Sequence, residues 1–354
     1  MIVNAVSKQA WPGAAVVNVS IVNWVKEPAE APTRFVLDDV VVDGITPSLR
    51  PAGTDLAGAR ALAQNRGRAF QGPIPAGADF VLAADEAAAL LTRTEADYSE
   101  VVRPYLVGED IADDPQQGPR RWIIDFDQKP LEAARTWPAA LGIVERDVRP
   151  KREQNRRALY RERWWIFAEP RPGMRRALAP LSRYIAANAQ GKRILFTWQE
   201  PSTCPSNLTN VFAFDDDFAI GVLASRIHGE WARAQSSTLR VDIRYTPTSA
   251  FETFPWPQPT AAQREAIGAA ARAVIARRQE ICAERQIGLT RLYNEVDDGA
   301  YVDLRRLHRQ LDEAVADAYD WPASVARDPA ESNRRLLELN RRIAAGELEY
   351  RPWS

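Results

Sequence analysis

The stretch LRVDIRYTPTSAFETFPWPQP, Leu239 to Pro259, contains a candidate strand followed directly by a candidate linker. Its first half alternates as a β-strand does, with Arg240, Asp242 and Arg244 on one face and apolar or aromatic residues on the other. Its second half is rich in proline and aromatic residues, which is typical of the closing segment of a domain. The stretch therefore predicts a polar strand face immediately before a domain boundary.

The residues after this stretch have a helical pattern. Thr260 and Gln263 have the spacing of a capping box, so a helix is expected to begin there. Apolar stripes at helical spacing then predict further helices, one around residues 304–318 and one from about 330 to 345. Residues 260–354 are expected to form a small all-helical unit.

Strands and helices alternate in the residues before it. EVVRPYLVGEDI, RRWIIDF, RILFTW and NVFAFDDD have strand-like composition. The segment from Asp215 to Gln235 predicts one helix, capped by its acidic triplet, with a buried stripe. The stripe residues are Ile220, Leu223, Ile227 and Trp231. This mixture predicts an α+β domain.

An apolar strand is also expected near the N-terminus, at about residues 17–22. Two alternative pairings are possible for this strand. It pairs either with FVLDDVVVDG, Phe35 to Gly44, or with strands outside this chain.

Composition limits the class of protein. Apolar residues make up 45% of the chain and charged residues 26%, as in an ordinary globular protein. No uninterrupted apolar stretch is long enough for a membrane span, and no signal peptide is evident. The chain has 2 Cys without metal-site spacing. These features predict a cytoplasmic protein that does not interact with membranes.

Positive charge is concentrated in one part of the chain. The net charge is −1 overall, yet residues 145–193 hold 14 Lys and Arg against 5 Asp and Glu. Within them, a basic helical stretch runs from about Leu141 to Trp165 and is interrupted by Pro150. Arg152, Arg156 and Arg163 can share one helical face. Arginine pairs well with phosphate oxygens. The segment is therefore a candidate phosphate-binding surface, although a solvated charged face is the alternative.

A coherent catalytic set is missing. The chain has 2 His, and His308 lies beside an apolar stripe, where a structural role is expected. His228 has two open roles, a structural hydrogen bond or a DNA contact. No glycine-rich nucleotide loop and no GxSxG motif occurs.

The polar strand also has two interpretations from its spacing alone. Arginine can pair bidentately with guanine, and a carboxylate can accept a hydrogen bond from the cytosine amine, so the strand could read bases in the major groove. Alternatively, Asp242 merely pairs with its two arginine neighbours on a solvated sheet face.

Several segments, taken in order, resemble a known family. They are RPYLVGEDI, RRWIIDF, RERWWIFAEPRPGMRRAL, SNLTNVFAFDDDFAIGVLASRIHGEWAR and RYTPTSAFETFPWP. Together they resemble the C-terminal half of the MmeI-like type II (IIL/IIG) restriction–modification methyltransferases. Those enzymes combine an endonuclease, an adenine methyltransferase and a target recognition domain in one chain. GLTRLYN and LHRQLDEAVADAYDWP resemble the helical C-terminal domain of the same family. The resemblance covers nearly the whole chain from about residue 10.

The resemblance implies a module that recognises a short asymmetric sequence of double-stranded DNA. Arg240, Asp242 and Arg244 are the expected base-reading residues, and Arg226 and His228 would contribute from the neighbouring helix. Contacts to DNA phosphates would position the module without reading sequence. The expected phosphate-binding residues are Lys151, Arg152, Arg156, Arg157 and Arg163.

The departures from the family matter equally. Its methyltransferase part carries a glycine-containing S-adenosylmethionine loop and an Asn-Pro-Pro-aromatic motif, and neither occurs in this sequence. AWPGAAVVNVSIVNWVKE resembles the last part of the methyltransferase domain. We therefore expect a recognition half that is truncated or separately encoded, with no catalytic residues, cofactor site or metal site. S-adenosylmethionine is expected on the missing methyltransferase half.

The expected fold is an α+β target recognition domain, residues 46–257, followed by a small all-α helical domain, residues 260–354. Residues 1–45 are expected to be a remnant of an α/β methyltransferase sheet. Three alternatives for function stay open. The chain is an enzyme in its own right, acts with a separate methyltransferase or nuclease polypeptide, or is a non-functional fragment of a disrupted gene.

Overall fold

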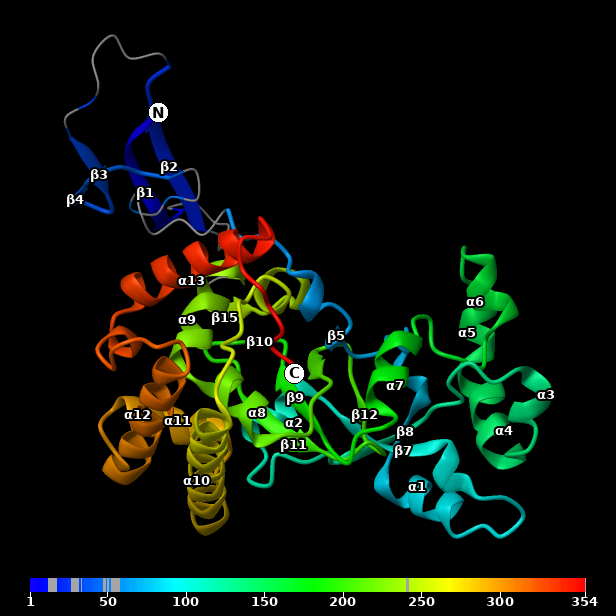
Figure 1. The fold of residues 1–354 in the computed structure, drawn as a ribbon. Coiled ribbons are helices and arrows are strands. Elements are labelled where there is room, and N and C mark those ends of the chain that lie inside the picture. Colours follow the sequence, from blue (N-terminus) through cyan, green and yellow to red (C-terminus); the bar gives the residue numbers. More distant parts are fainter. Residues whose placement is uncertain are drawn as a thin grey trace.

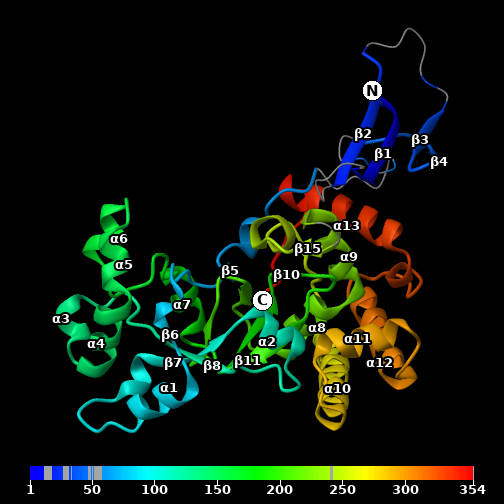
Figure 2. The same ribbon diagram turned by 180° about the vertical axis from the view of Figure 1, so that it is seen from behind.

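The computed structural model describes residues 1–11, 18–26, 32, 34–46, 49, 51, 58–239 and 242–353 (Figures 1 and 2). In this part of the chain, four small sheets precede a group of helices at the C-terminal end. The structure has the α+β class expected from the sequence, with helices after the sheets.

The N-terminal sheet is set apart from the rest of the molecule in both views (Figures 1 and 2). Its strands are β1 (Ile2–Ala10), β2 (Asn18–Trp24), β3 (Phe35–Leu37) and β4 (Val40–Val42), in the order β2-β1-β3-β4. The expected apolar strand is β2, although its first expected residue lies outside the described residues. Its direct partner is β1, an antiparallel strand that the sequence did not predict. β3 pairs with the other edge of β1, so β2 and the segment from Phe35 share a sheet without touching.

Three further sheets form the middle of the molecule. One has the order β11-β9-β13-β5 and contains β5 (Ala69–Gln71), β9 (Tyr184–Asn188), β11 (Phe196–Gln199) and β13 (Thr209–Phe212). A second has the order β12-β7-β8-β6 and contains β6 (Val81–Leu82), β7 (Val102–Leu106), β8 (Arg121–Ile124) and β12 (Cys204–Pro205). The third has the order β10-β15-β14 and contains β10 (Gln190–Gly191), β14 (Ser237–Leu239) and β15 (Asp242–Arg244). The four segments expected to be strands thus supply β7, β8, β11 and β13.

The helix predicted from Asp215 to Gln235 is two helices, α8 (Asp217–Ala224) and α9 (Arg226–Gln235). The side chain of Asp216 accepts a hydrogen bond from the Ala219 N–H, so the acidic triplet caps α8 as expected. Ser225 then ends α8 and caps α9, and its hydroxyl accepts from the His228 N–H. Because the break changes the helix direction without changing which face is buried, the whole predicted stripe is still in the core.

The C-terminal helices are α10 (Ala261–Arg285), α11 (Leu289–Asp297), α12 (Val302–Asp317) and α13 (Pro329–Ala344). The capping box of Thr260 and Gln263 begins α10 as predicted. α11 was not predicted. Its sequence shows a helical stripe only over a short span, which is too little to distinguish it from a loop.

Hydrophobic packing divides the chain into two cores. The larger core joins β9, β11 and β13 to α8, α9 and the C-terminal helices, so it continues across the proline-rich linker. α8 and α10 approach closely at Gly221, where an added Cβ would lie 2.7 Å from Ile267 Cγ2. At the end of the chain, Tyr350 is buried and its hydroxyl accepts from the Trp256 N–H. The domain boundary at residues 257–260 stays a prediction from composition. One hydrophobic core contains residues from both sides of it.

The smaller core lies beneath β6, β7 and β8. The helices between Ala84 and Leu178 are α1 (Ala84–Leu91), α2 (Gly108–Asp113), α3 (Leu131–Ala134), α4 (Pro138–Asp147), α5 (Arg149–Glu153), α6 (Ala158–Glu162) and α7 (Pro172–Leu178). α5 and α6 project from this part of the molecule in both views (Figures 1 and 2).

Candidate nucleic-acid interface

β15 carries two of the three residues of the predicted polar strand face, Asp242 and Arg244. Ile243 and Tyr245 are buried, Asp242 is half-buried and Arg244 is exposed, which is the alternation that a strand with one packed face requires. The predicted alternation is therefore confirmed for these four residues. Arg240, the third predicted reading residue, lies outside the described residues.

β15 is the central strand of its sheet rather than an edge. Gln190 on β10 pairs directly with Arg244 and is exposed, so an amide stands beside the guanidinium on this face. Sequence reasoning missed Gln190, because β10 is only two residues long and has no periodicity to detect. A glutamine amide complements adenine in the major groove, because its oxygen can accept from the N6 amine and its NH2 group can donate to N7.

One alternative for this face was mutual pairing of its charged residues. Among the described residues, Asp242 and Arg244 form no ion pair with each other or with a third side chain. This alternative is therefore not seen for Asp242 and Arg244, while the pairing of Asp242 with Arg240 lies outside the described residues. We call Gln190, Asp242 and Arg244 the strand face.

His228 belongs to the core. It is fully buried, its Nδ1 lies 2.9 Å from the Leu223 carbonyl oxygen, and its Nε2 lies 3.1 Å from the Tyr245 hydroxyl. Burial lowers the pKa of His228 to about 4, so the ring is neutral at neutral pH. A base contact would require the ring to leave these partners. The base-reading role predicted for His228 is therefore withdrawn, and its role is to fix α9 to the end of β15.

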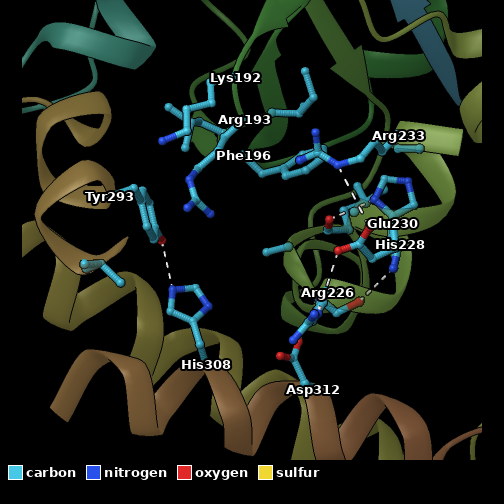
Figure 3. A pocket seen from close by; sticks show the side chains of 18 of the residues that line it. Lys192, Arg193, Phe196, Arg226, His228, Glu230, Arg233, Tyr293, His308 and Asp312 are labelled. Atoms are coloured by element: carbon cyan, nitrogen blue, oxygen red, sulfur yellow. Dashed lines mark hydrogen bonds and ion pairs between the residues drawn. The ribbon is translucent and has the colours of Figure 1, made fainter. Parts of the chain in front are cut away.

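Arg226 is exposed at the start of α9, and its backbone N–H donates to Asp312 Oδ1 at 2.7 Å. It lines a pocket together with Ile243 (Figure 3). Ile243 points to the opposite side of β15 from Arg244, because successive residues of a strand alternate. The structure thus places Arg226 on the pocket side and does not bring it to the strand face.

The predicted basic helix is broken into short pieces. α4 ends at Asp147, α5 covers Arg149–Glu153 with Pro150 in its first turn, and α6 begins only at Ala158. The prediction that Arg152, Arg156 and Arg163 share one helical face is therefore wrong. We call residues 149–163 the basic arm.

Arg152 points into the protein rather than toward solvent. It is 3% exposed, its Nη2 donates to the Pro75 carbonyl, and its guanidinium lies 5.6 Å from the centre of the Phe80 ring. Burial lowers its pKa. Because it already has partners and cannot reach solvent, it is removed from the predicted phosphate-binding residues, and it anchors the basic arm instead.

The other predicted phosphate-binding residues are accessible. Arg156 and Arg157 are exposed and Arg163 is half-buried. Arg157 donates to the Tyr160 hydroxyl at 2.9 Å, and Lys151 forms an ion pair with Asp79. Within the described residues, the Arg156 side chain has no hydrogen bond or ion pair, so it is the most available cation of the basic arm.

The described residues contain no group of three or more His, Cys, Asp or Glu side chains that could hold a metal ion. None of their helices combines the length and the apolar character needed to cross a membrane. Cys204 and Cys282 are buried and unpaired, and burial raises the pKa of both thiols.

Comparisons with known proteins define the class. The family model described as MmeI, target recognition domain, matches residues 69–258, which is more than half of the chain and includes the whole strand face. The protein is thus of the target recognition class. The chain belongs to the MmeI target recognition domain family.

Two known proteins are similar to this chain. A Bacillus subtilis (strain 168) protein named DNA methyltransferase A is 31% identical over 118 residues, which are 33% of this chain and 13% of that protein. A solved structure of the Type IIL restriction-modification enzyme MmeI in complex with DNA superposes with a TM-score of 0.76 at 19% identity. The match covers 97% of this chain and 46% of that one, so the chain spans about half the length of the solved relative.

Proposed function

We propose that this chain is the DNA sequence-specificity module of an MmeI-like restriction–modification adenine methyltransferase, and that it acts on double-stranded DNA in the cytoplasm. The observation that carries the proposal is the strand face, which lies inside the family match with its charged groups unpaired among the described residues.

The strand face can distinguish bases by hydrogen bonding. Arg244 offers two parallel donors for the N7 and O6 of guanine, and Asp242 offers acceptors for the cytosine amine. Gln190 adds an amide for adenine. Because Ile243 and Tyr245 are buried, the strand backbone that carries Asp242 and Arg244 is held in place before DNA arrives, which reduces the entropy lost on binding.

The basic arm supplies contacts of a second kind. Arg156, Arg157, Arg163 and Lys151 would pair with phosphate oxygens and set the position of the module on the duplex. These contacts would contribute affinity for any sequence, whereas the strand face would contribute preference.

Methyl transfer would be performed elsewhere in the enzyme. The sequence contains no Asn-Pro-Pro-aromatic motif, and the chain spans 46% of the solved relative. S-adenosylmethionine and the flipped adenine would then belong to a methyltransferase part, on the same polypeptide or on a separate one that binds this chain.

The experiment that tests the proposal is selection from a pool of randomised duplexes. The chain is incubated with the pool, and bound and unbound DNA are sequenced. We expect one short asymmetric sequence to be enriched. If the bound pool has the same sequence distribution as the input, the chain has no recognition function and behaves as a non-functional fragment.

A further inference from the structure

A second polar site lies on the other side of β15. It is a pocket of about 700 Å³ between the segment after β10, the start of α9 and the C-terminal helices α10, α11 and α12 (Figure 3). A volume of this size accommodates a small molecule. Since Ile243 contributes to its wall, the pocket is separate from the strand face.

The lining of the pocket is strongly basic. Seven Lys and Arg residues line it against three Asp and Glu residues, a formal excess of four positive charges. Charges in a partly enclosed site interact more strongly with a ligand than charges in open water, because less solvent screens them. The pocket therefore favours an anion with several negative charges.

Some of these cations have unused donors. Arg278 on α10 is 3% exposed; its Nη2 donates to the Phe196 carbonyl, but its Nε is buried without a partner among the described residues. The buried Nε of Arg193 also has none, although its guanidinium pairs with Asp297. A buried donor without an acceptor is costly and uncommon. The described residues thus leave part of the hydrogen-bonding capacity of these two guanidinium groups in the pocket wall unused.

Two further cations reach the pocket from α12. Arg305 and Arg309 are exposed, and Arg309 forms no hydrogen bond or ion pair with another described residue. They lie four residues apart on one helix, so both can approach the same ligand. Arg193 extends its guanidinium into the pocket from the opposite side (Figure 3).

The rest of the wall is apolar or aromatic. Leu223, Ala224 and Val296 contribute aliphatic surface, and the ring of Tyr293 lies beside His308, whose Nε2 is 3.0 Å from the Tyr293 hydroxyl. Burial, together with the charges of Arg278 and Arg193, lowers the pKa of His308 to about 4, so this ring is neutral at neutral pH. An anion with a flat, weakly polar part fits such a lining better than a small inorganic ion does.

We propose that this pocket binds a nucleotide through its phosphate groups, either a free nucleotide or a nucleotide of DNA bound by the chain. Arg193, Arg305 and Arg309 hold the phosphates, the buried Arg278 adds its positive charge from within the wall, and the Tyr293 side of the pocket contacts the sugar or base. This site is additional to the strand face, and its existence does not depend on base reading there.

The test compares one double variant and one single variant of α12, with ATP, inorganic pyrophosphate and adenosine as probes. Calorimetric titration of the full chain should detect ATP and pyrophosphate, with adenosine bound at least about tenfold more weakly than ATP, since it lacks the charged groups. R305Q/R309Q should weaken ATP binding by about tenfold or more. R306Q is the control, because Arg306 is an exposed arginine of α12 that does not line the pocket. It should change ATP binding by less than about twofold.

Binding of duplex DNA by the same variants distinguishes the two sources of the nucleotide. If ATP does not bind but R305Q/R309Q weakens duplex binding well beyond R306Q, the nucleotide belongs to DNA. If ATP does not bind and the variants bind duplex alike, or if R306Q weakens ATP binding as much as R305Q/R309Q, the proposal is wrong. Selection from the randomised pool reports on the strand face separately, so each proposal can fail alone.

Discussion

The strand face and the basic arm both present charged side chains to solvent, but they differ in what holds them. Beneath the strand face, Tyr245 contacts His228 and Phe212 in the larger core. The basic arm has little beneath it, since α6 contains no buried residue and Arg152 anchors α5. Side chains on a packed strand have fixed directions, whereas a charge run without a core beneath it has no preferred face. The first arrangement suits recognition of sequence, and the second suits contact with any duplex.

The largest expected difference is in stability. Phe254→Ala should lower the free energy of unfolding by about 3–5 kcal/mol, because Phe254 is fully buried against His228 and Trp231. Leu159→Ala on the basic arm should change it by less than about 0.5 kcal/mol, because Leu159 is 54% exposed. Urea unfolding of both variants measures the contrast. Similar losses in the two variants would show that the arm is packed as firmly as the support of β15.

His228 makes the support of the strand face sensitive to pH. Its pKa is about 4 in the folded chain against an ordinary value of 6.5, so below pH 6.5 the unfolded chain binds a proton that the folded chain does not. Stability should therefore fall by about 3 kcal/mol as the pH drops from 6.5 to 4. His228→Gln should remove this part of the pH dependence, as seen by urea unfolding at a series of pH values.

The difference between the wild-type and His228→Gln curves of stability against pH isolates the contribution of His228. Asp312, whose pKa burial raises to about 6, contributes to both curves and cancels. Parallel curves for wild type and variant would mean that His228 is accessible to protons in the folded chain.

Asp242→Asn tests the reading side of the comparison. The variant keeps the shape of the side chain but replaces one acceptor oxygen with a donor, so discrimination should fall at one base-pair position by about 1–3 kcal/mol. Competition binding with a set of duplexes changed one position at a time measures this. A uniform loss at every position would contradict a reading role.

Arg156→Ala tests the positioning side and should have the smallest effect. Binding should weaken about equally for all duplexes, and the slope of log affinity against log salt should become less steep by about 1. Arg306→Ala removes an equally exposed charge outside the basic arm and serves as the control. If Arg156→Ala instead changed preference at one position, the division between the two surfaces would be wrong.

The sequence predicted elements whose patterns are set by burial. The stripe from Ile220 to Trp231, the capping box at Thr260 and the alternation around Ile243 are all present, since each reflects a local contact with the core or the backbone. The break at Ser225 was not predicted, because the same residues are buried in one helix or two.

The candidate site was predictable only in part. Gln190 faces Arg244 because a distant strand pairs there, and no local pattern encodes that pairing. Arg152 and His228 were assigned to DNA by residue type, whereas the partners that bury them are distant in sequence or in another element. Polar residues are placed by tertiary contacts, which single-sequence patterns do not show.

The continuous larger core has a consequence for exchanging specificity between relatives. A graft that ends at residue 258 would take Gly221 and the stripe of α8 without Ile267 and Ala271 of α10, which cover them. The surface of α8 around Gly221 would then be exposed to water or covered by a helix of the recipient. In the native packing this surface is so close to α10 that one methyl group added at position 221 would clash with Ile267. A transferable cassette would therefore include α10 through α13 and the terminal segment that reaches Trp353, whose indole N–H donates to the Gln64 carbonyl.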